Sequence, residues 1–298
     1  MRWKMRRWRC DGYDKFQITP GFERLNNGVK SYLLDTNVWS SIASSPKATS
    51  NFLPWLEANN TIAAMSIFTE FELSRVSNLH QIVDQLLTIA SSRTYIPLLY
   101  DKLSDLEMSK YPNDNDVELL WASVTNFKHS AEINFISDIS QDSRFVNKRE
   151  EYLSFGKDKF MKLEDLKENF PLEDKDGNYS EENVDLFAWA TTLNFLTRYF
   201  PEFLHPFKGN LKAVDTSKLK SLYFRSQFLY FKYYVHKQSP AKSDFLDFAN
   251  VSYIPYIDTF VTERNILNVL SRMKKLGNKL SVCELVHVRS FVETIESS

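Results

Sequence analysis

The stretch Ser31-Tyr-Leu-Leu-Asp-Thr-Asn37, followed by the helix-like residues 38–43, decides the fold class of this chain. Its apolar half predicts a short buried strand, and its polar half predicts a turn into a helix. The apolar run 61–68, Thr-Ile-Ala-Ala-Met-Ser-Ile-Phe, predicts a second buried strand, and residues 80–91 behind it have helical spacing. Strands that alternate with helices are typical of an α/β protein built on a parallel sheet.

The end of the chain returns to the same alternation, and its middle does not. Residues 258–262, Asp-Thr-Phe-Val-Thr, predict a strand between two helical segments. Residues 95–240 contain long stretches with helical spacing, separated by polar turns. We therefore expect a parallel sheet domain flanked by helices and formed from two parts, 31–94 and 241–298, with an α-helical subdomain inserted at 95–240 and a basic N-terminal extension at 1–30.

The composition excludes several classes of function. The formal net charge is -1, from 37 Lys and Arg against 38 Asp and Glu, so any nucleic-acid partner must be bound by a local patch. The seven glycines are too scattered for a dinucleotide-binding or phosphate-binding loop. Two cysteines and five histidines form neither a CxxC nor an HExxH motif, and GxSxG is absent from the sequence. If the chain is an enzyme, its chemistry is expected to rest on carboxylates.

The sequence also predicts where the protein acts. No stretch reaches the roughly 18 uninterrupted apolar residues that a membrane span requires. The basic start, Met1-Arg-Trp-Lys-Met-Arg-Arg-Trp-Arg9, has no apolar segment behind it of the kind that a signal peptide needs. We therefore expect a cytoplasmic protein that does not enter a membrane.

Two carboxylates follow the first two predicted strands. Asp35 comes directly after the strand, and in an open parallel sheet the residues past the carboxyl ends of strands line the ligand crevice. Asn37 can reach the same place. The alternative is that Asp35 only caps the next helix, a position that Asp favours. Glu72 lies on the helix after the second strand, where it either faces the crevice or is a solvated helix acid.

Further acids surround the third predicted strand. Asp244 and Asp247 are spaced i,i+3 on an otherwise apolar helix, so their carboxylates share one face and repel unless a cation or a basic residue compensates them. Asp258 begins the strand and Glu263 follows it. If the sheet is parallel, carboxylates from three α/β units meet at one edge. Mg²⁺ and Mn²⁺ prefer such oxygen ligands, and they assist attack on phosphodiesters.

Three segments resemble the motifs of PIN-domain nucleases. Leu33-Leu-Asp-Thr-Asn-Val-Trp39 looks like their opening motif, and Ser66-Ile-Phe-Thr69 with Glu72-Leu73 is similar to their second. Asp247 followed by Tyr256-Ile-Asp-Thr-Phe-Val-Thr-Glu-Arg264 resembles the late motif. The resemblance covers roughly residues 30–93 and 240–296, and it implies a metal-dependent nuclease that acts mostly on RNA. Many members of the family are toxins that a protein antitoxin restrains.

Carried over by position, the resemblance implies that Asp35, Glu72 and Asp247 bind Mg²⁺ or Mn²⁺. Family members commonly have Asp close to the late Thr, where this chain has Glu263, so the fourth acid stays open between Glu263, Asp258 and Asp244. The chemistry is expected to rest on Asp35, Glu72, Asp247 and Asp258. The expected metal ligands are Asp35, Glu72, Asp244, Asp247 and Glu263, and the expected supporting polar groups are Asn37, Thr262 and Glu263.

The basic and aromatic segment 218–237 has two interpretations. Aromatic rings beside cations are one means of holding single-stranded RNA, and on this view Lys218, Lys220 and Arg225 contact it. The alternative is a helix that buries its aromatic side chains in the core and leaves its cations on the other face. The first interpretation assigns substrate choice, or the holding of a partner, to the insertion.

The function expected from these observations is hydrolysis of RNA by a metal-dependent endoribonuclease, with single-stranded DNA as a further substrate. A toxin or defence effector with an inhibitory protein partner fits the resemblance. An inactive PIN-like module that binds nucleic acid or protein is the main alternative. A phosphotransferase of the haloacid dehalogenase type also begins with a strand ending in Asp, but it requires a second Asp where this chain has Asn37.

Overall fold

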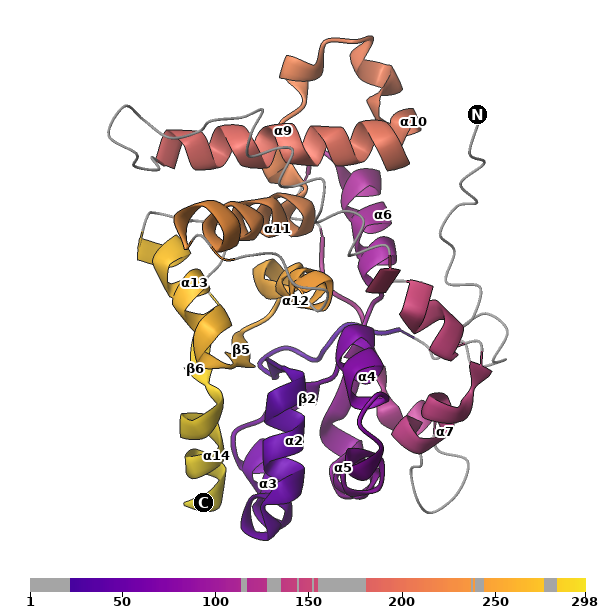
Figure 1. Ribbon diagram of the computed structural model, residues 1–298, viewed down its shortest axis with the longest axis vertical. Helices are drawn as coiled ribbons and strands as arrows, with labels where there is room; N and C mark the ends of the chain where they lie inside the picture. Colours follow the sequence, from indigo (N-terminus) through magenta and orange to yellow (C-terminus); the bar gives the residue numbers. More distant parts are fainter. Residues whose placement is uncertain are drawn as a thin grey trace.

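A six-stranded sheet organises the computed structural model, and helices cover both of its faces (Figure 1). The strand order is β4-β3-β2-β1-β5-β6. The expected basic extension falls mostly on residues 1–21, which lie outside the described residues. The structure describes residues 22–113, 117–127, 135–143, 145–151, 153–154, 181–236, 238, 244–275 and 283–298.

The sheet is parallel apart from one edge strand. β1 pairs in parallel with β2 and β5, β2 with β3, and β5 with β6, whereas β4 runs antiparallel to β3. The predicted α/β class is thereby confirmed. The strands are β1 (Lys30–Leu34), β2 (Thr61–Ala64), β3 (Thr94–Pro97), β4 (Trp121–Ser123), β5 (Thr259–Thr262) and β6 (Glu284–His287).

The segment expected to be a helical insertion also contributes strands. β3 and β4 come from residues 94–97 and 121–123, so the sheet extends past the boundary expected at residue 94. Both strands are very short, and neither gives the alternating pattern by which a strand is read from sequence. The helices of the described segment are α6 (Tyr100–Lys110), α7 (Phe135–Gln141), α9 (Glu181–Tyr199), α10 (Pro201–Leu204) and α11 (Lys220–Tyr230), which continues as the π-helical turn η7 (Phe231–Val235).

Alternate residues of the central strands build two separate cores. Leu34 and Val261 point to one core, which they share with Trp39 of the first helix after β1. Leu33 and Phe260, one residue earlier on each strand, point to the other. This is the period of two that a strand imposes on its side chains. The helices around the first core include α2 (Thr36–Ser44), α3 (Pro46–Ala58), α4 (Ile67–Leu73), α5 (Ser77–Ile89) and α14 (Val288–Glu296), and α7 also contributes to it.

The second core joins the middle of the chain to the sheet. Phe228 of α11 and Tyr230 lie in the same buried cluster as Leu33 and Phe260. Figure 1 shows α11 between α9 and α12 (Asp244–Val251), and α13 (Arg264–Lys275) lies beside it. α11 and η7 are therefore part of the sheet domain's own core. Within the described residues, no helix is both long and apolar enough to cross a membrane.

Candidate functional site

Asp35 lies at the carboxyl edge of the sheet, between two adjacent parallel strands. Leu34 of β1 pairs with Val261 of β5, so the residues that follow them, Asp35 and Thr262, are neighbours. The Thr262 hydroxyl donates to Oδ2 of Asp35 at 2.8 Å, and the Thr36 amide donates to Oδ1 at 2.8 Å. Asp35 is 5% exposed. Asp35 thus caps α2 and also contacts the end of β5, and burial raises the pKa of its carboxyl.

Glu72 reaches the same edge from α4. Its Oε2 accepts a hydrogen bond from the Thr36 hydroxyl, which connects Glu72 to the turn that holds Asp35. Burial raises the pKa of Glu72 to about 7, the Thr36 hydrogen bond opposes the rise, and the charges of Asp35 and Asp247 add to it. The acids expected to meet from three chain segments therefore do lie within electrostatic reach of one another.

Asp247 is the third acid of this group and comes from α12. Burial raises its pKa to about 7; the ammonium of Lys232 opposes the rise, and the charge of Asp35 contributes to it. The side chain of Asp247 is 21% exposed, more than that of its neighbour Asp244 at 7%. Asp247 is therefore the more accessible of the two acids of α12.

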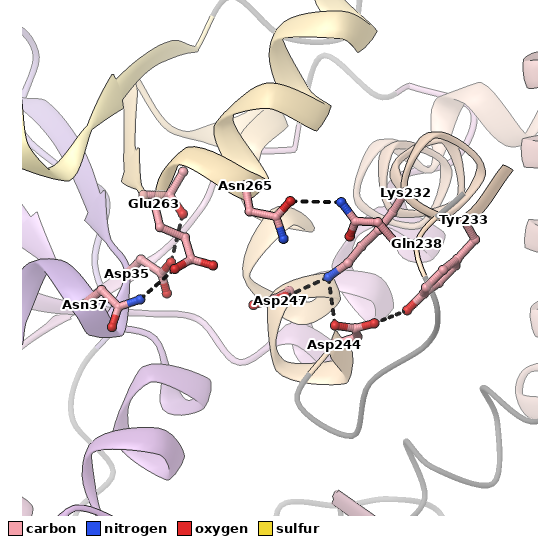
Figure 2. A network of polar contacts seen from close by, with 10 residues as sticks. Asp35, Asn37, Lys232, Tyr233, Gln238, Asp244, Asp247, Glu263 and Asn265 are labelled. Atoms are coloured by element: carbon pink, nitrogen blue, oxygen red, sulfur yellow. Dashed lines mark hydrogen bonds and ion pairs between the residues drawn. The ribbon is translucent and has the colours of Figure 1, made fainter. Parts of the chain in front are cut away.

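Asp244 and Asp247 are compensated by one buried lysine. Nζ of Lys232, on η7, donates to Oδ1 of Asp244 at 2.8 Å and to Oδ2 of Asp247 at 2.9 Å (Figure 2). The Tyr233 hydroxyl donates to the other oxygen of Asp244. Burial by itself would lower the pKa of Lys232, but the two carboxylates outweigh it and hold that pKa above its ordinary value. Both carboxylate oxygens of Asp244 are thus occupied, one by the ion pair with Lys232 and the other by the Tyr233 hydroxyl.

Glu263 joins the cluster and Asp258 does not. The Asn37 amide donates to Oε2 of Glu263 at 3.0 Å, and the charge of Glu263 contributes to the raised pKa of Asp35. Asp258 precedes β5 and accepts from the amide and the hydroxyl of Ser31, at 2.8 and 2.9 Å, at the start of β1. The expectation that Asp258 lies with the other acids is wrong, because the amino ends of parallel strands lie at the opposite edge. Of the candidates for the fourth acid, Glu263 lies beside Asp35.

The carboxylate oxygens of these acids are ligands of the kind that a hard divalent cation prefers. Asp35, Glu72 and Asp247 offer carboxylate oxygens whose burial and mutual repulsion a cation would offset. Among the residues that the structure describes, no three or more His, Cys, Asp or Glu side chains are grouped so that they could hold a metal ion. Mg²⁺ does not require such a group, because it is usually bound by one or two carboxylates and keeps several waters.

The raised pKa values give the fold a predictable pH dependence. The folded-state pKa of Glu72, about 7, lies above its ordinary value of 4.5, so the folded state binds more protons than the unfolded state between these limits. We expect the melting temperature in chelator to fall as pH rises from about 5 to about 7.5. The groups around Glu72 that set this behaviour are Asp35, Asp247 and Arg75.

Melting curves against pH, with chelator and with Mn²⁺, measure this effect. The matched variant is Glu72→Gln, whose side chain cannot ionise. Its melting temperature should fall less between about pH 5 and about pH 7.5 than that of the wild type. Bound Mn²⁺ should reduce the fall in the melting temperature of the wild type, because the ion neutralises the acids. A melting temperature that rises over this interval in chelator would contradict the assignment of a raised pKa to Glu72.

The cations expected to contact RNA have different surroundings. The guanidinium of Arg225 lies 4.9 Å from the ring centroid of Tyr100 and 4.8 Å from that of Phe195, and it donates to the Tyr100 hydroxyl. Arg225 therefore belongs to the packing between α6, α9 and α11, and the expectation that it faces RNA is corrected. Lys218, in the short helix before α11, and Lys220, its first residue, are half-buried. The aromatic side chains of α11 are largely buried, as the core-packing interpretation predicts.

Replacing Arg225 by Gln tests this correction. The variant loses contacts with two rings, each worth about 0.5–2 kcal/mol, so we expect the free energy of unfolding to fall by about 1–3 kcal/mol. Affinity for single-stranded RNA should stay within about twofold of the wild type once both proteins are folded. Denaturant titration and a binding assay at fixed salt measure the two quantities. A loss of RNA affinity without a loss of stability would restore Arg225 to the binding surface.

Sequence reasoning missed two residues of this site, Thr36 and Lys232. Thr36 bridges Asp35 and Glu72 but differs in no visible way from an ordinary first residue of a helix. Lys232 had a signal: the Asp244 and Asp247 pair requires a compensating cation, and Lys232 lies in the basic segment that leads into α12.

Comparison of the chain with models of protein families, with curated proteins and with solved structures gave no match. The PIN-like interpretation consequently depends on the motifs and on the geometry described above.

Proposed function

We propose that this protein is a PIN-like, divalent-cation-dependent endoribonuclease. The observation that carries the proposal is the position of Asp35 at the carboxyl edge of a parallel sheet, where Thr36 hydrogen-bonds to both Asp35 and Glu72 and the charges of Asp35 and Asp247 raise the pKa of Glu72. These three acids come from the end of β1, from α4 and from α12, which are distant in sequence, and they are the acids that the resemblance assigns to the metal. Burying acids near one another is costly unless a cation compensates them, so their burial here favours a role in binding a cation.

One or two of the Asp35, Glu72 and Asp247 carboxylates would hold the Mg²⁺ or Mn²⁺ ion directly, and the ion would supply positive charge to the scissile phosphate and to the attacking water. The chain's own residues orient these ligands. The Thr262 hydroxyl and the Thr36 amide each fix one oxygen of Asp35, and the Thr36 hydroxyl fixes one oxygen of Glu72. Preorganisation of this kind lowers the cost of binding, because the carboxylates are already positioned before the cation arrives.

The substrate and setting follow from the same resemblance. RNA is the proposed substrate, and single-stranded DNA is a second one to be tested. Lys218 and Lys220 remain the candidate phosphate contacts of the middle segment. A role as a cytoplasmic toxin or defence effector would involve an inhibitory protein partner that covers this edge of the sheet.

Incubation of the purified protein with total RNA and with single-stranded DNA, in Mn²⁺ and in chelator, tests the proposal. We expect internal cleavage of RNA in Mn²⁺ and none in chelator. RNA that stays intact in Mn²⁺, at protein concentrations that saturate binding, would overturn it.

A second candidate function is an inactive PIN-like module that binds nucleic acid or protein. The observation that favours it is the ion pair of Lys232 with Asp247, because the ammonium already neutralises part of the acidic cluster. RNA binding that needs no divalent cation, together with no cleavage under any condition tested, would support this alternative.

A further inference from the structure

Lys232 places a permanent positive charge inside the acidic site. Its side chain is 4% exposed, and its Nζ lies 2.8 Å from Asp244 and 2.9 Å from Asp247. The ring centroids of Phe228 and Phe248 lie 6.0 and 5.7 Å from the same nitrogen. Two carboxylates and two aromatic faces thus enclose the ammonium, an arrangement that stabilises a desolvated cation.

The local backbone is adapted to this placement. Lys232 lies on the π-helical turn η7, which continues α11, and π-helical turns are frequent at functional sites. The Gln238 amide, just after this turn, also donates to Asn265 of α13 at 2.8 Å, which ties the end of the turn to the late part of the sheet domain (Figure 2). The middle segment of the chain therefore supplies a charged residue to the site.

Asp244 and Asp247 have different parts in holding the ammonium. Both oxygens of Asp244 are engaged, Oδ1 by Lys232 and Oδ2 by the Tyr233 hydroxyl, so Asp244 serves as a fixed support. Asp247 gives only Oδ2 to Lys232, and its charge also acts on Glu72 on the other side. Asp247 is therefore attracted by the ammonium and repelled by the remaining acids, and it has one oxygen that Lys232 does not contact.

We propose that the Lys232 ammonium is a built-in cation that fills one of two cation positions in this site, so that the protein binds a single divalent ion, on the Asp35 and Glu72 side of Asp247. This inference builds on the proposed cation-dependent function. Lysine suits the position because its ammonium is a compact charge with three donors. The Phe228 and Phe248 rings add favourable contacts to the ammonium at this position.

Counting bound Mn²⁺ by titration calorimetry tests this proposal. The wild type should bind one equivalent, and Lys232→Ala should bind two, because the variant leaves Asp244 and Asp247 uncompensated and opens space for an ion with its waters. The matched control, Lys232→Ala with Asp244→Asn, removes that second position and should return to one equivalent. Lys232→Arg keeps the charge and should also bind one.

Two results would overturn the proposal: two equivalents bound by the wild type, or no additional ion bound by Lys232→Ala. If Lys232→Ala does not fold, Lys232→Gln, which is uncharged and closer in size, takes its place with the same expected gain. A wild type that binds no Mn²⁺ would refute the proposed function, and with it the single divalent ion on the Asp35 and Glu72 side. If the wild type binds no ion, binding of one Mn²⁺ by Lys232→Ala or Lys232→Gln would still support a cation position that Lys232 fills. Binding of no ion by these variants would refute that position.

Discussion

Replacing Asp35 by Asn is expected to lower the rate of cation-dependent RNA cleavage by about a thousandfold, which corresponds to roughly 4 kcal/mol of lost transition-state stabilisation. The change removes the charge of a ligand that lies 5% exposed between β1 and β5. It keeps the shape of the side chain, and Asn caps helices as well as Asp does. The Thr262 hydroxyl, which donates to Asp35, can turn to accept from the new amide.

Initial cleavage rates in saturating Mn²⁺ measure this loss. The matched control is Asp258→Asn, because Asp258 is an exposed carboxylate at the opposite edge, where it accepts hydrogen bonds from Ser31. The control should cleave within about threefold of the wild-type rate, a limit set by the small effect of surface changes. Asp35→Asn should melt in chelator no lower than the wild type, because it removes a buried charge from a crowded site. Wild-type cleavage by Asp35→Asn would refute the assignment of the site.

Asp244→Ala is expected to lower the free energy of unfolding by about 3–5 kcal/mol, the usual cost of breaking a buried ion pair from one side. Asp244 accepts from Lys232 and from Tyr233, and its side chain is 7% exposed. Its removal leaves the buried ammonium with Asp247 alone and the Tyr233 hydroxyl without this acceptor. The structure thereby assigns stability to Asp244, whereas Asp247 remains the acid expected to matter more for catalysis.

Denaturant titration in chelator measures the loss, and a double-mutant cycle identifies its cause. Adding Lys232→Met to Asp244→Ala should recover part of the stability, because no buried ammonium then remains unpaired. Asp244→Asn, which keeps an oxygen acceptor, should cost less than Asp244→Ala. A loss below about 1 kcal/mol for Asp244→Ala would show that the ion pair contributes little to the fold.

Much of the fold could be predicted from the sequence, because local patterns carry the necessary information. The buried strand before Asp35, the apolar run at 61–64 and the strand at 259–262 each bury both faces, which is typical of a parallel sheet. Parallel pairing then brings the residues after these strands to one edge. For this reason the positions of Asp35 and Glu72 near this edge were predictable from strand polarity, whereas Asp247 lies on α12, before β5, and was assigned by the resemblance.

The antiparallel strand β4 and the extent of the middle segment were less predictable. β4 has only the residues Trp121–Ser123, and its pairing with β3 depends on the rest of the fold. The burial of α11 against the sheet was open between a core helix and an RNA-binding surface. Periodicity cannot distinguish these alternatives in a helix with aromatic residues on every side.

The sequence by itself determined the parallel α/β sheet and the position of Asp35 at its carboxyl edge, because strand patterning and strand polarity are local properties. Only the tertiary structure decided the partners of the charges. It placed Lys232, 12 residues before Asp244, between two acids, and it placed Arg225 between two rings. Which opposite charge or aromatic face a buried cation contacts depends on how helices pack, and desolvation makes that choice energetically large although sequence spacing does not encode it.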